Sequence, residues 1–81
     1  PKQLRLANAN VKTTVEQVNE GYRITLDCNT LAKNVFIQTQ ANGHFSDNYF
    51  DLLPGEKKQV LFKTEQIVDT PAKAFLVKTL N

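Results

Sequence analysis

The sequence predicts an all-β domain, an antiparallel two-sheet sandwich of six or seven short strands. Apolar and polar residues alternate with a period of two along most of the chain, and turn-forming residues recur roughly every 8 to 12 residues. No apolar period of 3.6 residues persists long enough for a helix that would face a core. At 81 residues, a chain buries only about 60% of its unfolded surface, so we expect residues 1–81 to form a single domain with one core.

The first two strands are expected to form a hairpin. Alternation runs from Val11 to Val18, and Asn19-Glu20-Gly21 then supplies a turn. The pattern resumes from Tyr22 to Cys28, where every second residue is apolar and falls on one face. Two alternating runs joined by so short a turn indicate neighbouring antiparallel strands.

The middle of the chain predicts two further strands. Val35 and Ile37 begin the third strand, which has Phe36 and Gln38 on its opposite face and ends at Asn42-Gly43. A fourth strand is predicted over the single run 45–53, with residues 50 and 52 facing inward, before Pro54-Gly55-Glu56 turns the chain.

The last part of the chain predicts two more strands, separated by an irregular segment. Residues 58–64 form a fifth strand, residues 65–71 are irregular, and residues 73–80 close the chain with a sixth. Gln3–Ala7 is the candidate for a seventh.

Short strands with regularly spaced turns are typical of the immunoglobulin-like sandwich, in which inward-facing residues of both sheets form the core. The strand faces give the expected core: Val15, Tyr22, Ile24, Leu26, Val35, Ile37, Phe50, Leu52, Val60, Phe62, Phe75 and Val77.

Charge and composition give no sign of nucleic-acid or membrane partners. The net charge is +2, and the lysines are scattered, with one adjacent pair at Lys57-Lys58. A nucleic-acid-binding domain is expected to gather its basic residues beside stacking aromatic residues. No apolar run approaches the roughly 20 residues that cross a bilayer, and the first residues lack the apolar run of a signal peptide. We interpret the chain as a fragment excised from a longer protein.

Chemically reactive residues are few, and we expect no catalytic residue, cofactor or metal. His44 follows the Asn42-Gly43 turn and is interpreted as an exposed turn residue, and the single Cys28 as a free, buried thiol. Glu20 follows an Asn, as the acid/base carboxylate of many glycosidases does, but it precedes a glycine in a predicted turn and has no second carboxylate beside it. The acidic residues of the segment 47–56 do not have the spacing of a calcium loop.

One block is more specific than strand patterning: Phe45-Ser46-Asp47-Asn48-Tyr49-Phe50-Asp51-Leu52-Leu53-Pro54-Gly55-Glu56. With the preceding Asn34-Val35-Phe36-Ile37 and the following Val60, this block resembles the C-terminal immunoglobulin-like domain of β-mannosidases of glycoside hydrolase family 2. The looser match extends over residues 22–64. The residue types of the block indicate turn formation and side chain to backbone hydrogen bonds, which is an architectural role.

The resemblance implies a non-catalytic accessory domain whose partners are the remaining domains of the parent glycosidase. In that family a (β/α)8 barrel supplies both catalytic glutamates, so no catalytic residue is transferred to this chain. The parent would remove terminal, non-reducing β-D-mannose residues and would be extracytoplasmic, that is periplasmic, secreted or lysosomal. The alternative is an independent carbohydrate- or protein-binding sandwich module. Sugar-binding modules normally present exposed aromatic rings, and this chain has no Trp and two tyrosines, so we expect any carbohydrate binding to be weak.

An accessory domain needs a surface that contacts its neighbours. Phe36, Leu61 and Leu76 have the parity opposite to the core residues of their strands, so we expect them to face outward as an interdomain contact. If this is correct, at least two of them should be exposed and adjacent. The alternative is that the segment 65–71 covers one or more of them.

Overall fold

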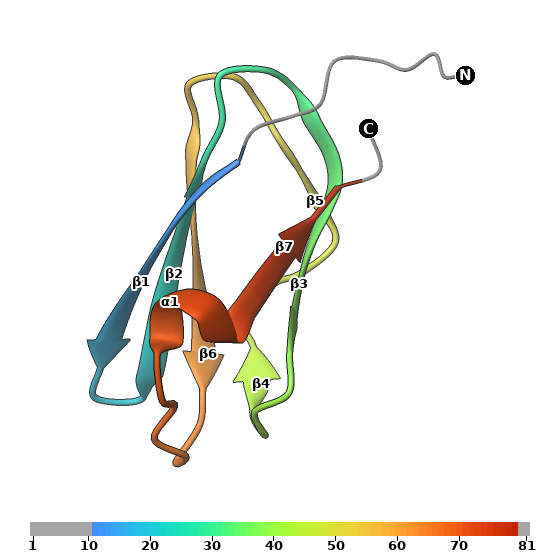
Figure 1. Ribbon diagram of the computed structural model, residues 1–81. Helices are drawn as coiled ribbons and strands as arrows, with labels where there is room; N and C mark the ends of the chain where they lie inside the picture. Colours follow the sequence, from blue (N-terminus) through green and yellow to red (C-terminus); the bar gives the residue numbers. More distant parts are fainter. Residues whose placement is uncertain (1–10, 80–81) are drawn as a thin grey trace.

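The computed structural model of the protein describes residues 11–79, which form two antiparallel sheets packed face to face (Figure 1). One sheet has the strand order β1-β2-β6-β4 and the other the order β5-β3-β7. The elements are β1 (Lys12–Val18), β2 (Gly21–Asp27), β3 (Ala32–Thr39), β4 (His44–Phe45), β5 (Phe50–Leu52), β6 (Lys57–Lys63), α1 (Pro71–Ala74) and β7 (Phe75–Lys78). The predicted all-β, immunoglobulin-like sandwich is confirmed.

The predicted hairpin and its register are confirmed. β1 pairs with β2 with Val15 opposite Ile24, and β2 lies between β1 and β6 as a central strand. Ile24 and Leu26 are fully buried, whereas Arg23 and Thr25 on the other face are half-buried. A slip of one residue would exchange these two faces, so burial fixes the register.

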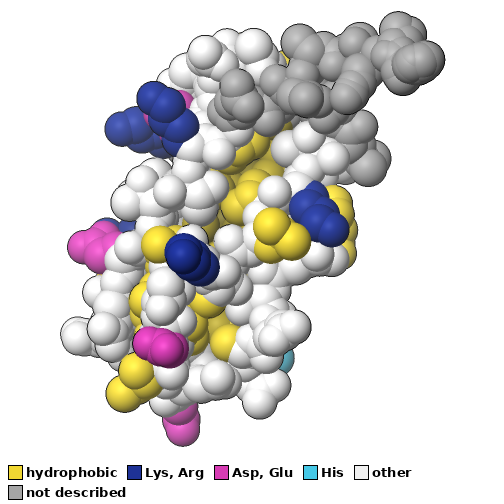
Figure 2. Space-filling view, viewed as in Figure 1, with side chains coloured by type: hydrophobic (Ala, Val, Ile, Leu, Met, Phe, Trp, Pro, Cys, Tyr) yellow, Lys and Arg dark blue, Asp and Glu magenta, His cyan; other side chains and the backbone are white. Residues whose placement is uncertain are grey.

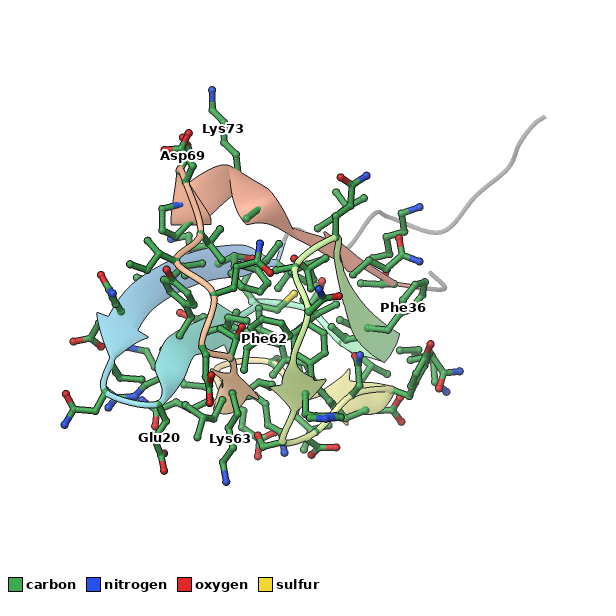
Figure 3. The ribbon with its side chains drawn as sticks, turned by 90° about the horizontal axis from the view of Figure 1, so that it is seen from below. Glu20, Phe36, Phe62, Lys63, Asp69 and Lys73 are labelled. Atoms are coloured by element: carbon green, nitrogen blue, oxygen red, sulfur yellow. The ribbon has the colours of Figure 1, made fainter. Side chains whose placement is uncertain are left out.

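Aromatic rings fill the core at the end of the sandwich where β2 begins and β6 ends. The ring centroid of Phe62 lies 4.7 Å from that of Phe45 and 5.3 Å from that of Phe75, which also contacts Tyr22 at 6.0 Å. Figure 3 shows Phe62 pointing into the space between the sheets. Most of the predicted core is buried, and the structure adds two small residues to it, Cys28 and Ala32.

Val15, Phe50 and Val77 were predicted as core residues but are only half-buried, although each packs against the core. All three lie on edge strands, β1, β5 and β7, although Leu52 and Phe75 on two of these strands are buried. Figure 2 shows hydrophobic side chains in a strip along the middle of one face, between β1 and β7, where the sandwich is open. Alternation predicts which face of a strand a residue occupies, and all three residues are on the predicted inner face, but it does not predict how deeply an edge-strand residue is buried.

The prediction of one continuous strand over residues 45–53 is wrong. The run is divided into β4, which pairs with β6, and β5, which pairs with β3 in the other sheet. The four residues between them cross from one sheet to the other. The apolar residues change parity across it, from Phe45 to Phe50 and Leu52, so one continuous strand would leave Phe45 on the outer face, whereas Phe45 packs against the core.

The predicted strand over residues 73–80 is too long at its start, because α1 comes first. Thr70 has a left-handed backbone with φ of 55°, and Lys73 N donates to Thr70 O at 3.0 Å, which closes one helical turn. Pro71 suits the first helical position because its φ is fixed and it lacks an N–H. No helix within residues 11–79 is long and apolar enough to cross a membrane. The candidate strand Gln3–Ala7 lies outside the described residues.

The predicted irregular segment after β6 is tied to the core by hydrogen bonds. The Val68 amide donates to the hydroxyl of Tyr22 at 2.8 Å, and the Thr64 hydroxyl donates to Asn42 O at 2.6 Å. Gln66 also accepts from the amide of Asn42 at 3.1 Å. These contacts hold together the loops at one end of the sandwich.

Truncation of Leu26 tests the assigned core. Leu26→Ala should lower the free energy of unfolding by about 2 to 5 kcal/mol, because it removes buried methyl groups and leaves a cavity. The measurement is urea denaturation of the 81-residue chain, with Thr25→Ala as the matched control on the other face of β2. A loss for Leu26→Ala no larger than that for the control would contradict the assigned register.

Candidate functional site

The segment with the most specialised side-chain contacts is the crossing between the sheets, residues 46–49. It begins at the end of β4 in one sheet and delivers the chain to β5 in the other (Figure 1). The crossing lies inside the block that the sequence singles out. Its chemistry therefore decides whether that block is a reactive site or a structural device.

Ser46 anchors the start of the crossing to β6. Its amide donates to Leu61 O at 2.7 Å, and its hydroxyl oxygen accepts from the amide of Leu61 at 2.9 Å. The side chain thus replaces a backbone carbonyl in one further rung of the β4–β6 ladder. A serine hydroxyl can accept in this way because it is short and adjoins its own backbone.

Asn48 anchors the end of the crossing to β3 in the second sheet. Its Oδ1 accepts from the amide of Ile37 at 2.8 Å, and its Nδ2 donates to Ile37 O at 3.1 Å. The carboxamide therefore acts as a backbone peptide would in a strand pair, offering one acceptor and one donor. Ile37 is 2% exposed, so these backbone groups would otherwise be buried without this partner.

Asp47, between the two anchors, is held by charge and by a local hydrogen bond. Its Oδ2 pairs with Lys58 Nζ at 2.7 Å, and its Oδ1 accepts from the amide of Asn48 at 2.8 Å. The hydrogen bond with Lys58, followed by that from Asn48, lowers the pKa of Asp47 below its ordinary value of 3.8. Lys58 Nζ also lies 5.1 Å from the ring centroid of Phe50, so it covers that half-buried ring.

Tyr49 makes the turn into β5 with a left-handed backbone. Its φ is 60°, and its amide donates to Asn48 Oδ1 at 3.2 Å. Its ring stacks on Phe36 with centroids 5.4 Å apart and planes inclined by 17°. The tyrosine side chain is therefore directed over the outer face of the second sheet.

The remainder of the block forms the turn that the sequence predicts. Glu56 N donates to Leu53 O at 3.1 Å, and Gly55 at the third position has φ of 77°, a value that favours glycine. Gly55 N also donates to Cys28 O at 2.9 Å, which ties the turn to the end of β2. The predicted turn chemistry is confirmed.

The candidate reactive residues do not come together as a catalytic site in the described part of the chain. His44 is exposed on β4, Glu20 is exposed in the β1–β2 turn, and Cys28 is a buried free thiol with its Sγ 3.7 Å from Thr30 Oγ1. Asp51 accepts from the amide of Asn34 at 3.0 Å, where Asn34 has φ of 49° beside a bulge in β3. Residues 11–79 contain no group of three His, Cys, Asp or Glu side chains placed to hold a metal ion.

The three predicted contact residues lie on two different faces. Phe36 on β3 and Leu76 on β7 face outward from the same sheet, and Figure 3 shows Phe36 directed away from the interior. Leu61 lies on the outer face of the other sheet, opposite Arg23. Leu76 is 55% exposed, but the other two are half-buried. The expectation of two exposed neighbours is therefore not met, and Tyr49, not the segment 65–71, stacks on Phe36.

The expected side chain to backbone hydrogen bonds of the block are present, but the sequence pattern missed the stacked pair and the partners of both anchors. The residue type at position 49 did not indicate a positive φ, because asparagine and glycine are the usual residues with a left-handed backbone. Ser46 and Asn48 were visible as turn-type residues, but their partners on β6 and β3 lie 15 and 11 residues away. Such distant partners are recognised only once the strand order is known.

Replacing Asn48 tests the second anchor. Asn48→Ala should lower the free energy of unfolding by about 1 to 3 kcal/mol, since it leaves the amide and carbonyl of Ile37 without this partner. Asn42→Ala is the matched control, because the hydrogen bonds of Asn42 within residues 11–79 are made by its backbone. Chemical denaturation of both variants measures the effect, and equal losses would show that the anchor contributes nothing of its own.

The ion pair of Asp47 predicts a pH dependence. Because the pKa of Asp47 is lowered on folding, its stabilisation is present above the ordinary value of 3.8 and is lost as the pH falls through the folded value. Asp47→Asn should therefore lower the melting temperature at pH 7, and the difference from the wild type should shrink below pH 3.8. Asp69→Asn controls for the loss of one exposed carboxylate. A difference that stays constant down to acidic pH would contradict this assignment.

Comparison with known families extends the resemblance beyond the central block. The family model Ig_mannosidase, described as an Ig-fold domain, matches residues 6–81, which is nearly the whole chain. A search of curated proteins gave no significant match. The matched range includes the crossing and all strands of the sandwich. The chain belongs to the Ig_mannosidase family of Ig-fold domains.

Proposed function

We propose that this domain is a non-catalytic accessory domain of a β-mannosidase of glycoside hydrolase family 2. The parent enzyme would hydrolyse terminal, non-reducing β-D-mannose residues, and the barrel domain would supply its catalytic carboxylates. The family match, which associates Ig-fold domains of this kind with mannosidases, supports the proposal.

The observation that carries the architectural role is the use of the polar side chains in the crossing. Ser46, Asp47 and Asn48 each make hydrogen bonds that hold the chain between the two sheets. Their oxygen and nitrogen atoms are engaged in the fold itself. Side chains occupied in this way position strands and leave no pair free for acid and base roles.

Contact with a neighbouring domain of the parent is proposed at the β7 side of the sandwich. Leu76 is 55% exposed on the outer face of β7, and Val77 is half-buried on its inner face, where it packs against the core. Figure 2 shows the hydrophobic strip that continues along the opening between β1 and β7. A domain that covers β7 would bury both residues. Leu61 stays a predicted contact for a second surface.

Leu76→Ser tests this contact in two proteins. In the 81-residue chain it should change the free energy of unfolding by less than about 0.5 kcal/mol, because the side chain is already exposed. In the full-length parent it should cost more than about 1 kcal/mol, because a buried contact is lost. Thermal melting of both proteins measures the difference.

Leu53→Ser is the matched control, since Leu53 is 52% exposed but lies in the turn after β5. It should have little effect in either protein. A destabilised fragment with an unaffected parent would place Leu76 in the core of the domain and contradict the contact. Hydrolysis of a chromogenic β-mannoside by the 81-residue chain would contradict the non-catalytic role.

A further inference from the structure

The outer face of the β5-β3-β7 sheet carries a small aromatic platform. Tyr49 is 69% exposed although one face of its ring stacks on Phe36. The exposed area therefore belongs to the opposite face and the edges of the ring. Phe36 supports the ring from below, as a second layer on the sheet.

The ring of Tyr49 is held in place by contacts within the domain itself. Asn48 accepts from the amide of Tyr49, and the same Asn48 is fixed to Ile37 on β3 by two hydrogen bonds. A left-handed backbone is strained for a bulky residue, and asparagine or glycine would make the same turn at lower cost. The turn alone therefore does not explain a tyrosine here. A ring that is already immobilised loses little side-chain entropy on binding.

Polar side chains share the outer face of the sheet with this platform. Asp51 faces outward on β5, since Phe50 and Leu52 on either side of it face the core. Gln38 is exposed two residues after Phe36 on the same face of β3, and Lys78 lies opposite Phe36 on β7. The same face of the sheet thus carries an aromatic ring, a carboxylate, an amide and an ammonium group.

This combination matches the chemistry of a sugar ring. A pyranose has one face of C–H groups, which packs on an aromatic ring, and a rim of hydroxyl groups that accept from amides and ammonium groups and donate to carboxylates. A protein interface normally buries about 800 Å² on each partner, far more than one ring offers. The platform therefore favours a small ligand over a protein.

We propose that Tyr49, backed by Phe36, is a stacking site for one residue of an oligosaccharide, with Asp51, Gln38 and Lys78 contacting its hydroxyl groups. The choice of mannose as the sugar rests on the proposed function. The site lies on the β5 side of the sheet, whereas the proposed domain contact is on the β7 side, with β3 between them. Ligand sites are common at the borders between domains, so the two surfaces are compatible.

The test is an NMR titration of the 81-residue chain with β-1,4-linked mannotriose. Resonances of Tyr49 and Phe36 should shift, and affinity should be in the millimolar range, as expected for one stacked ring. Tyr49→Ala should weaken binding about tenfold, because it removes the stacking surface. Tyr49→Phe keeps the ring and should bind within about twofold of the wild type. Ile67→Ala is the control, since Ile67 is 82% exposed and lies in the loop after β6.

Several outcomes distinguish this site from the alternatives. Binding of cellotriose as tightly as mannotriose, with the same dependence on Tyr49, would support the stacking site but contradict the assignment to mannosides. Shifts that persist unchanged in Tyr49→Ala, or no shifts at millimolar sugar, would overturn the site. A Tyr49→Ala variant that binds sugar normally but destabilises the full-length parent would identify the platform as a domain contact and would also overturn it.

Discussion

The sandwich depends on the chain crossing between its two sheets within four residues. Ser46 is bonded to the β4–β6 side and Asn48 to β3, so each sheet holds one end of the crossing. In both cases a side chain takes the place of a backbone group in a strand ladder. Because side chains fill these hydrogen-bonding positions, the chain can leave one sheet and join the other without leaving buried backbone groups unpaired. The positions of β5, the stacked rings and the following turn all depend on it.

The arrangement of edges explains which apolar residues are accessible. β1 and β7 lie on the same side of the sandwich and leave an opening there, whereas β4 and β5 form the opposite side. On that opposite side Lys58 extends over Phe50 and pairs with Asp47, so a charged side chain covers the rim of the core. No described charged pair covers the opening between β1 and β7 in the same way. The two sides therefore differ in polarity, because a charged pair lies at the rim beside β5 and none of the described ones lies between β1 and β7.

The sequence predicted the features that depend on local alternation. The faces of β2, β3 and β6, and the turn at Gly55, agree with the structure because burial of one face and a positive φ each leave a local pattern. The crossing was missed because the run 45–53 was interpreted as one strand, although Phe45 and Phe50 have opposite parity and both pack against the core from different sheets. The platform was missed because the neighbour of Phe36 depends on the pairing of β3 with β5. Alternation indicated that Phe36 faces outward, but it could not identify Tyr49 as the residue that stacks on it.

The strand order also determines how this domain reaches its native state. Of the pairings within residues 11–79, only β1 with β2 joins strands that follow one another along the chain. β2 pairs with β6, and β3 pairs with β5 and β7, all of which come later in the chain. Most strand pairings therefore require a long loop to close, at a cost in chain entropy, before their hydrogen bonds and contacts stabilise the domain. Domains dominated by such non-local pairings fold in about milliseconds to seconds, much more slowly than helical domains of equal length. Of these pairings, that of the β1–β2 hairpin closes the shortest loop, and the apolar face of the hairpin stays open to water until the β5-β3-β7 sheet packs on it.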